Sequence, residues 1–221
     1  MLIDVHAHFF HERAGRADWQ ERNASRLSAG ERMGIRWHVA SILGSWGHTS
    51  PVYFPSPADV SFANHRMRDL TAAHPARIRG YVVVNPNHTA HALAEIATGA
   101  AQGMIGVKLA ASRRADDPLL DPVCQAAREH RLPVLHHVWQ HRRREWPGQE
   151  ASDGVELCRL AARHREVRFL LAHIGGGGDW LHTLRVARGA PNVLLDLSGS
   201  GVDGGMLDEA LRAVGADRLV W

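Results

Sequence analysis

Short apolar segments alternate with longer segments of helical composition along almost the whole chain. The apolar segments have the length of buried strands, and the helical segments end at a glycine, as at Gly34, or before a proline, as at Pro75. We expect strands at residues 2–9, 37–43, 80–84, 105–110, 132–138, 167–172 and 192–197, and the start of an eighth strand at 218–221. We expect helices at about 19–33, 57–73, 89–101, 122–130, 154–164 and 206–214, and a further one that opens at glycines 175–178.

This regular alternation predicts a parallel sheet whose strands are joined by helices. Seven strand–helix units and part of an eighth are close to the number that closes a barrel, so the fold class that we expect is α/β, a (β/α)8 TIM barrel truncated in its eighth strand. No linker or repeat divides the chain, and we expect a single barrel domain over residues 1–221 that lacks its C-terminal end. A Rossmann-type sheet is the alternative, but the first strand is not followed by the glycine-rich turn of that fold.

Composition narrows the class of protein. With 221 residues and 45% hydrophobic content, the chain can bury one substantial core. The net charge is +3, Lys108 is the only lysine, and no basic stripe is interleaved with aromatic residues, so we do not expect a nucleic-acid partner. Cys124 and Cys158 lie in expected helices and indicate a reducing compartment. We see no signal peptide and no apolar run of membrane-spanning length, and therefore expect a cytoplasmic protein without a membrane partner.

Histidines stand at the ends of three expected strands. His6 and His8 lie two residues apart on the first strand, so their side chains project to the same face. This spacing alone is weak evidence, because a chain with 16 histidines contains such a pair by chance. The fifth strand, however, contains His136 and His137, and the sixth ends at His173. Because the active site of a (β/α)8 barrel forms at the C-terminal ends of its strands, we predict a metal site there.

Several motifs, in their order and strand placement, carry a family resemblance. They are Ile-Asp-Val-His-Ala-His-Phe at the start, Leu-Pro-Val-Leu-His-His in the fifth strand, Leu-Leu-Ala-His-Ile-Gly-Gly-Gly at the sixth and Asn-Val-Leu-Leu-Asp-Leu-Ser at the seventh. Together they resemble the amidohydrolase superfamily, in particular the type 2, amidohydrolase-related group of TIM-barrel metal-dependent hydrolases similar to aminocarboxymuconate semialdehyde decarboxylase.

The resemblance implies one divalent metal ion, usually zinc, bound by His6, His8 and a histidine of the fifth strand. The family ligand falls four residues after the proline, which selects His137 and turns His136 away from the barrel axis. The resemblance also implies a catalytic role for His173 and, often, a homodimer. Asp196 and Ser198 are expected to support the site, and a second metal on a carboxylated Lys108 is not expected.

The family places a further metal-ligating aspartate at the end of the eighth strand, after a stretch like Arg218-Leu219-Val220-Trp221. The sequence ends before that position, so this chain is either a fragment, which we favour, or a protein without this carboxylate. We favour the fragment because an eighth strand that stopped after its first residues would leave its edge unpaired.

The reaction is left open between two types. We expect hydrolysis of a C–N or C–O bond in a small molecule by a metal-activated water, or nonoxidative decarboxylation of an unsaturated or aromatic carboxylic acid. A catalytically inactive barrel that acts as a binding protein and a metal-dependent nuclease are two further possibilities. Phe9 and Trp139 are candidates for the wall of a substrate pocket, and Arg113 is a candidate for binding a substrate carboxylate.

Overall fold

Eight parallel strands form one sheet in which each strand pairs with the next along the chain. The computed structural model describes residues 1–13, 16–43, 55–110, 112–137, 152, 154–174, 180–198 and 204–221. The strands are β1 (Leu2–His8), β2 (Ile35–Ser41), β3 (Ile78–Val84), β4 (Gly106–Leu109), β5 (Val134–His137), β6 (Phe169–Ala172), β7 (Val193–Asp196) and β8 (Leu219–Val220).

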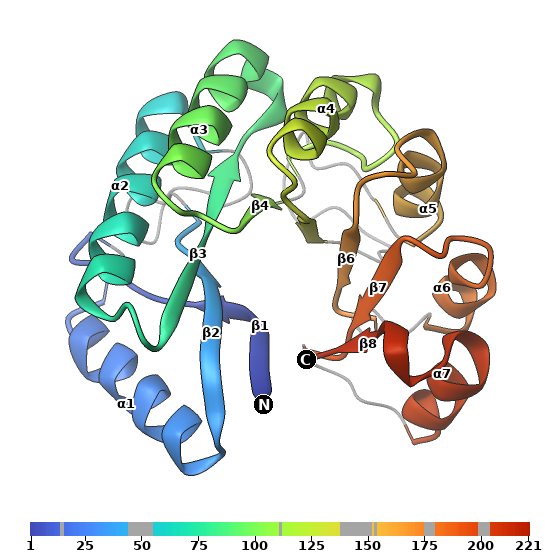
Figure 1. Cartoon of the computed structure of the whole chain (residues 1–221), viewed down its shortest axis with the longest axis horizontal. Coiled ribbons are helices and arrows are strands. Elements are labelled where there is room, and N and C mark those ends of the chain that lie inside the picture. The colour runs from blue at the N-terminus through green and yellow to red at the C-terminus, as the bar shows by residue number, and fades with distance from the viewer. Residues whose placement is uncertain are drawn as a thin grey trace.

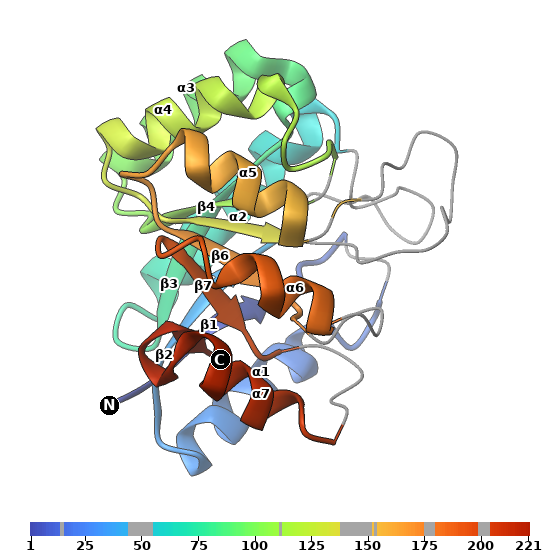
Figure 2. The same ribbon diagram turned by 90° about the vertical axis from the view of Figure 1, so that its right-hand side faces the viewer.

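Helices connect the strands and cover the outside of the barrel (Figures 1 and 2). They are α1 (Trp19–Arg32), α2 (Pro57–Ala73), α3 (Thr89–Ala101), α4 (Asp121–Glu129), α5 (Gly154–Arg163), α6 (Trp180–Ala187) and α7 (Met206–Val214). Short 3-10 turns lie at Pro86–His88, Pro118–Leu120 and Ala216–Arg218. The predicted (β/α)8 TIM barrel is confirmed, and its eighth strand lies at the end of the chain. None of the helices in the described ranges is long and apolar enough to cross a membrane.

A hydrogen bond at Trp221 links the end of the last strand to the first strand in the nearly closed barrel. The backbone N–H of Val5 in β1 donates to the carbonyl of Trp221, next to β8, at 2.9 Å. The side chain of Tyr81, in β3, donates to the carbonyl of Val5 at 2.9 Å across the barrel interior. Val5 is therefore tied to both the end of the chain and β3.

Two strands start earlier in the structure than we predicted. We expected the second at 37–43, but β2 is Ile35–Ser41, and the third at 80–84, but β3 is Ile78–Val84. Gly34 explains the first difference, because its positive φ of 72° ends α1 and lets the chain enter β2 at the next residue. The helix start expected at glycines 175–178 lies outside the described residues.

Apolar side chains pack in two layers. The larger layer lies between strands and helices and includes Phe9, Leu109, Phe169 and Leu171. The smaller one fills the barrel interior with residues that alternate with the first set along each strand: Val39, Tyr81, Leu135, Leu170 and Ala172, with Ile3, Val5, Leu194 and Val220 packed against them. The interior is thus a packed floor below the ends of the strands.

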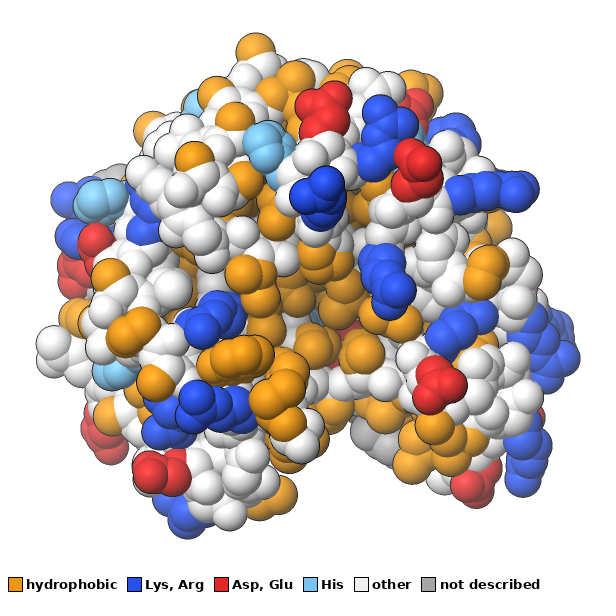
Figure 3. Space-filling model, in the orientation of Figure 1, with side chains coloured by type: hydrophobic (Ala, Val, Ile, Leu, Met, Phe, Trp, Pro, Cys, Tyr) orange, Lys and Arg blue, Asp and Glu red, His pale blue; other side chains and the backbone are white. Residues whose placement is uncertain are grey.

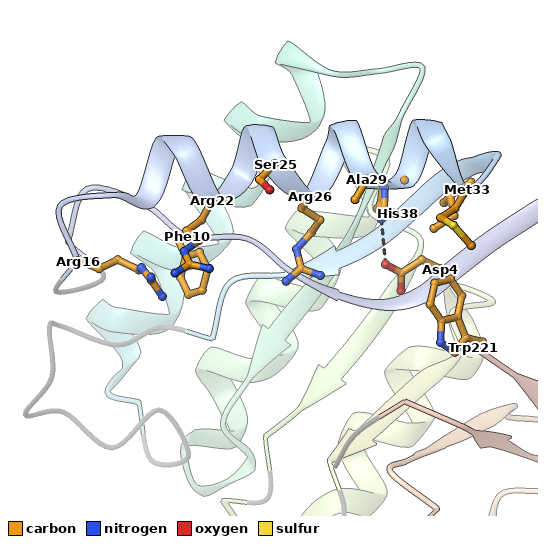
Figure 4. Close-up of a pocket in the computed structure, with 12 residues that line it drawn as sticks. Asp4, Phe10, Arg16, Arg22, Ser25, Arg26, Ala29, Met33, His38 and Trp221 are labelled. Carbon is orange, nitrogen blue, oxygen red and sulfur yellow. Dashed lines mark hydrogen bonds and ion pairs between the residues drawn. The ribbon is translucent and has the colours of Figure 1, made fainter. Parts of the chain in front are cut away.

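A cavity of about 430 Å³ lies outside this barrel wall, between α1, the first two strands and Trp221 (Figure 4). Several polar residues line it, and two of them, Asp4 and His38, are in contact, with His38 Nδ1 2.9 Å from an Asp4 carboxylate oxygen. In the space-filling view the surface is notched between α1 and α7, on the side where this cavity opens (Figure 3). None of His6, His8, His137 and His173 lines the cavity, so it is separate from the cluster of strand-end histidines.

Candidate metal centre

A β-bulge in the first strand brings His6 to the barrel interior. Asp4 pairs with His38 of β2 and Ala7 pairs with Ala40, so three steps along β1 match two along β2 and one residue is extra. Val5 packs in the interior layer, and with strict alternation His6 would join Asp4 on the outer face. The extra residue resets the alternation, and His6 and His8 both lie on the inner side.

Asp196, at the end of β7, fixes the orientation of His6. Its Oδ2 atom lies 2.6 Å from His6 Nδ1, and both side chains are buried. Ser198 donates to Asp196 from its hydroxyl at 2.5 Å and from its backbone N–H at 2.9 Å. A carboxylate only accepts hydrogen bonds, so the proton of His6 is held on Nδ1 and Nε2 carries a lone pair.

The other histidines expected at the centre lie around His6. The ring centroids of His8 and His173 are 5.1 Å and 4.8 Å from that of His6, and the ring of His137 is 4.8 Å from that of His173. Three strands, β1, β5 and β6, therefore deliver imidazoles to one place. His136 lies elsewhere: it pairs with Leu109 and Leu171 of the outer layer, and its Nδ1 contacts the carbonyl of His137 at 2.8 Å.

His173 has a strained backbone, with a φ of 64°. This left-handed conformation is uncommon for residues other than glycine and occurs at functional sites more often than elsewhere. The ring Nδ1 lies 3.1 Å from the carbonyl oxygen of Ser198, which can only accept a hydrogen bond, so Nδ1 carries the proton and Nε2 a lone pair. The next residue, Ile174, donates its N–H to the carbonyl of Asp196 at 3.0 Å. The contacts to β7 hold the strained turn in place.

Burial keeps these imidazoles neutral. It lowers the pKa of His6 to about 4, with the nearby Lys108 as the second cause. The pKa values of His8 and His137 lie well below the ordinary histidine value, and that of His173 is also lowered, again through burial first and Lys108 second. Burial opposes ionisation of Asp196, but its hydrogen bonds with His6 and Ser198 prevail and lower its pKa to about 2.

This donor set fits a divalent metal ion. Neutral imidazole nitrogens are ligands for zinc and other transition metals, and a histidine ligand commonly donates its second N–H to a carboxylate, as His6 does to Asp196. Donor atoms of His6, His173 and Asp196 lie within 4.8 Å of one another. These three residues could therefore hold the ion, and the predicted ligand roles of His8 and His137 stay predictions.

The side chain of Lys108, in β4, also points into this cluster. Its Nζ atom lies 2.8 Å from His6 Nε2, and the residue has no exposed surface. Burial lowers the pKa of its amine to about 7, although the charge of Asp196 partly opposes this. The sequence placed Lys108 in a strand and raised it only as a ligand of a second metal ion, which we did not expect. Its contact with His6 joins residues 102 positions apart, which no local pattern reveals.

The three residues predicted to bind substrate are placed differently. Phe9 is only 3% exposed and packs in the outer layer against His38, so its packing does not favour contact with a substrate. Arg113 follows β4 and forms an ion pair with Asp117. Trp139 lies outside the described residues. Their roles in substrate binding stay predictions.

The fold and the cluster define an α/β barrel enzyme with an imidazole-rich centre at the strand ends. The amidohydrolase family model matches residues 3–221, and the chain belongs to the amidohydrolase family. This confirms the family predicted from the strand-end motifs, a family of metal-dependent enzymes of hydrolase or carboxy-lyase type. No curated protein sequence matches the chain.

Solved structures share the fold at low sequence identity. A 2,6-dihydroxybenzoate decarboxylase from Rhizobium superposes with a TM-score of 0.71 at 16% identity, covering 99% of this chain and 86% of that one. A 5-carboxyvanillate decarboxylase from Novosphingobium aromaticivorans, complexed with manganese and 4-hydroxy-3-methoxy-5-nitrobenzoic acid, has a TM-score of 0.63 at 19% identity, with 88% and 68% covered. A probable 2-pyrone-4,6-dicarboxylic acid hydrolase from Acinetobacter baumannii, with citric acid bound, has a TM-score of 0.64 at 17% identity, with 100% and 82% covered.

Proposed function

We propose that the chain is a metal-dependent hydrolase that cleaves a C–N or C–O bond in a small molecule. His6, His8 and His137 hold one divalent metal ion, for which zinc is our first choice because imidazole nitrogens suit it. His173 is the catalytic histidine. One observation carries the proposal: neutral imidazoles from three strands meet at one point, and Asp196 orients one of them.

The residues of the chain have separate tasks in this proposal. A bound divalent ion polarises a substrate oxygen and lowers the pKa of water. Asp196 keeps the lone pair of His6 on Nε2, facing the centre. His173 keeps its proton on Nδ1, so its Nε2 can accept a proton from the attacking water and pass it to the leaving group. Its lowered pKa keeps this atom unprotonated at neutral pH.

Nonoxidative decarboxylation of an aromatic or unsaturated acid is the second candidate. The likeness to decarboxylases of aromatic acids supports it, whereas the likeness to a dicarboxylic acid hydrolase supports hydrolysis. The three similar enzymes are all named for small carboxylic acids, so we propose a substrate of this class. The two cysteines are free thiols, which is consistent with the cytoplasmic location that we propose.

Metal analysis tests the centre first. We expect about one zinc or manganese ion per chain in the wild-type protein and its loss in His6→Ala and His137→Ala, measured by mass spectrometry of the metal after dialysis. His65→Ala is the matched control, because His65 is a helical histidine whose side chain is 60% exposed. Wild-type protein that stays metal-free after reconstitution would refute the proposal.

Two substrates then separate the reactions. Metal-loaded protein is incubated with 2-pyrone-4,6-dicarboxylate, followed by the loss of its ring absorbance, and with 2,6-dihydroxybenzoate, followed by the release of carbon dioxide. Ring opening supports hydrolysis, and carbon dioxide release supports the second candidate. A folded, metal-loaded protein that turns over neither these nor a wider set of amides, lactones and unsaturated acids would favour a binding protein.

A further inference from the structure

The side-chain amine of Lys108 is buried. In the described part of the chain it makes a polar contact with His6, a candidate metal ligand. It has no exposed surface, and its register neighbours are Val83 in β3 and Leu135 in β5. The Nζ atom reaches His6 Nε2 at 2.8 Å. The reaction proposed above does not use it.

A buried amine needs a hydrogen-bond acceptor, because an unsatisfied donor inside a protein is costly. Among the residues that the structure describes, no carboxylate lies within ion-pair distance of Lys108. The nearby carboxylate of Asp196 already accepts from His6 Nδ1 and from Ser198. The lone pair of His6 Nε2 is therefore the acceptor that Lys108 has.

A metal ion held by His6 would take the same lone pair. Nε2 is the free nitrogen of His6, since Nδ1 is occupied by Asp196. A nitrogen that donates its lone pair to a metal can no longer accept a hydrogen bond from an amine. Once the ion is bound, Lys108 needs another acceptor within the short reach of Nζ around His6.

The charges around Nζ favour an anion as that acceptor. Imidazoles that bind a metal ion are neutral, and among the described residues Asp196 is the carboxylate in contact with the cluster. A divalent ion adds two positive charges to the buried site. A ligand carboxylate would satisfy the amine and offset this excess, whereas a neutral carbonyl would only satisfy the amine.

We infer that Lys108 is a substrate-binding residue, whose Nζ donates a hydrogen bond to a carboxylate of the substrate when the metal site is filled. This inference rests on the proposed function and deepens it, since it selects acids over neutral amides and esters. It requires that Lys108 is not itself needed to hold the metal. It also requires that the amine changes partner when an acid binds.

The test compares wild-type protein with Lys108→Met, which keeps a similar volume without the donor. Leu135→Met is the matched control, because Leu135 is a register neighbour that is fully buried in the barrel interior and has no polar atom. Each protein is loaded with manganese, and its metal content and circular dichroism are measured. Calorimetric titration then gives the Kd of 2,6-dihydroxybenzoate and that of its neutral amide.

We expect about one metal ion per chain in all three proteins. Lys108→Met should bind the acid at least tenfold more weakly than the wild type, and its affinity for the amide should change much less. Leu135→Met should bind both ligands like the wild type. Because Lys108 is the only lysine, protein labelled with ¹³C-lysine gives one side-chain signal, which should shift when the acid is added and not when the amide is added.

Three results would overturn the inference alone: equal affinity of wild type and Lys108→Met for the acid, loss of metal from Lys108→Met, or a metal-loaded wild type that binds neither 2,6-dihydroxybenzoate nor citrate. A wild-type protein that binds no metal would instead refute the proposed function itself, and the inference with it. The metal content therefore separates the two failures.

Discussion

Asp196→Asn tests how far one hydrogen bond controls the metal centre. Asp196 Oδ2 is 2.6 Å from His6 Nδ1, and both side chains are buried. Asparagine has the same shape, but its amide group can donate to Nδ1. The proton of His6 would then move to Nε2 and block the atom that faces the cluster. We expect the variant to fold and to bind metal more weakly.

The magnitude follows from the role of Asp196 as an outer partner of a ligand. Removing such a partner lowers metal affinity by about 10- to 100-fold, or about 1.4 to 2.7 kcal/mol. The pKa of Asp196 is lowered to about 2, so the wild-type carboxylate is ionised throughout the assay range. The ratio of the two affinities should therefore be the same at pH 7 and pH 8.

Competition with a fluorescent chelator measures the Kd for zinc. Ser198→Ala is the control, because it removes the 2.5 Å hydrogen bond to Asp196 but leaves the contact between Asp196 and His6. We expect a smaller loss of affinity in this control than in Asp196→Asn. If folded Asp196→Asn binds zinc as tightly as the wild type, Asp196 does not set the tautomer of His6, and the reasoning is refuted.

Three further predictions concern packing and protonation. Gly30→Ala places a Cβ atom 2.2 Å from Nε2 of His38, whose ring is buried and hydrogen-bonded to Asp4. Urea denaturation should therefore show a free energy of unfolding lower by roughly 1–3 kcal/mol. A double variant with His38→Ala should recover part of this stability, and no recovery would contradict the clash. Burial raises the pKa of the Cys124 thiol to about 12, so iodoacetamide at pH 8 should modify Cys124 only after the protein unfolds. Peptide mass spectrometry would show the modification, and rapid modification of the native protein would contradict this. In metal-free protein the pKa of His6 is about 4, against 6.5 for the ordinary residue, so the unfolded state takes up a proton first as the pH falls. The free energy of unfolding should therefore drop between pH 6.5 and pH 4, by up to about 3 kcal/mol from this residue. A urea midpoint that stays constant over that range would contradict a neutral buried His6.

The sequence predicted the fold because each strand and helix has a local signal. The strand-end positions of His6, His137 and His173 were also visible, and the barrel rule that strand ends share one face predicted that they meet. The structure brings these histidines together.

Other parts of the site depend on register between distant strands, which local patterns do not encode. The contacts of His6 with Lys108 and Asp196 join β1 to β4 and β7. The bulge of β1 was invisible for the same reason, since it exists only relative to β2. The left-handed backbone of His173 carried no sequence signal either, because histidine has no special preference comparable to that of glycine.

The bulge in β1 sets how far the histidines reach as well as which way they point. Deleting Val5 would remove the bulge between Asp4 and Ala7, so that Asp4 still faces out and His6 and His8 still face in, yet the strand would be shorter by about 3.3 Å. That distance exceeds the 2.6 Å and 2.8 Å contacts that tie His6 to Asp196 and Lys108. Over evolutionary time this strand should accept substitutions at Val5 far more readily than the loss of one residue, because the extra residue serves as a spacer.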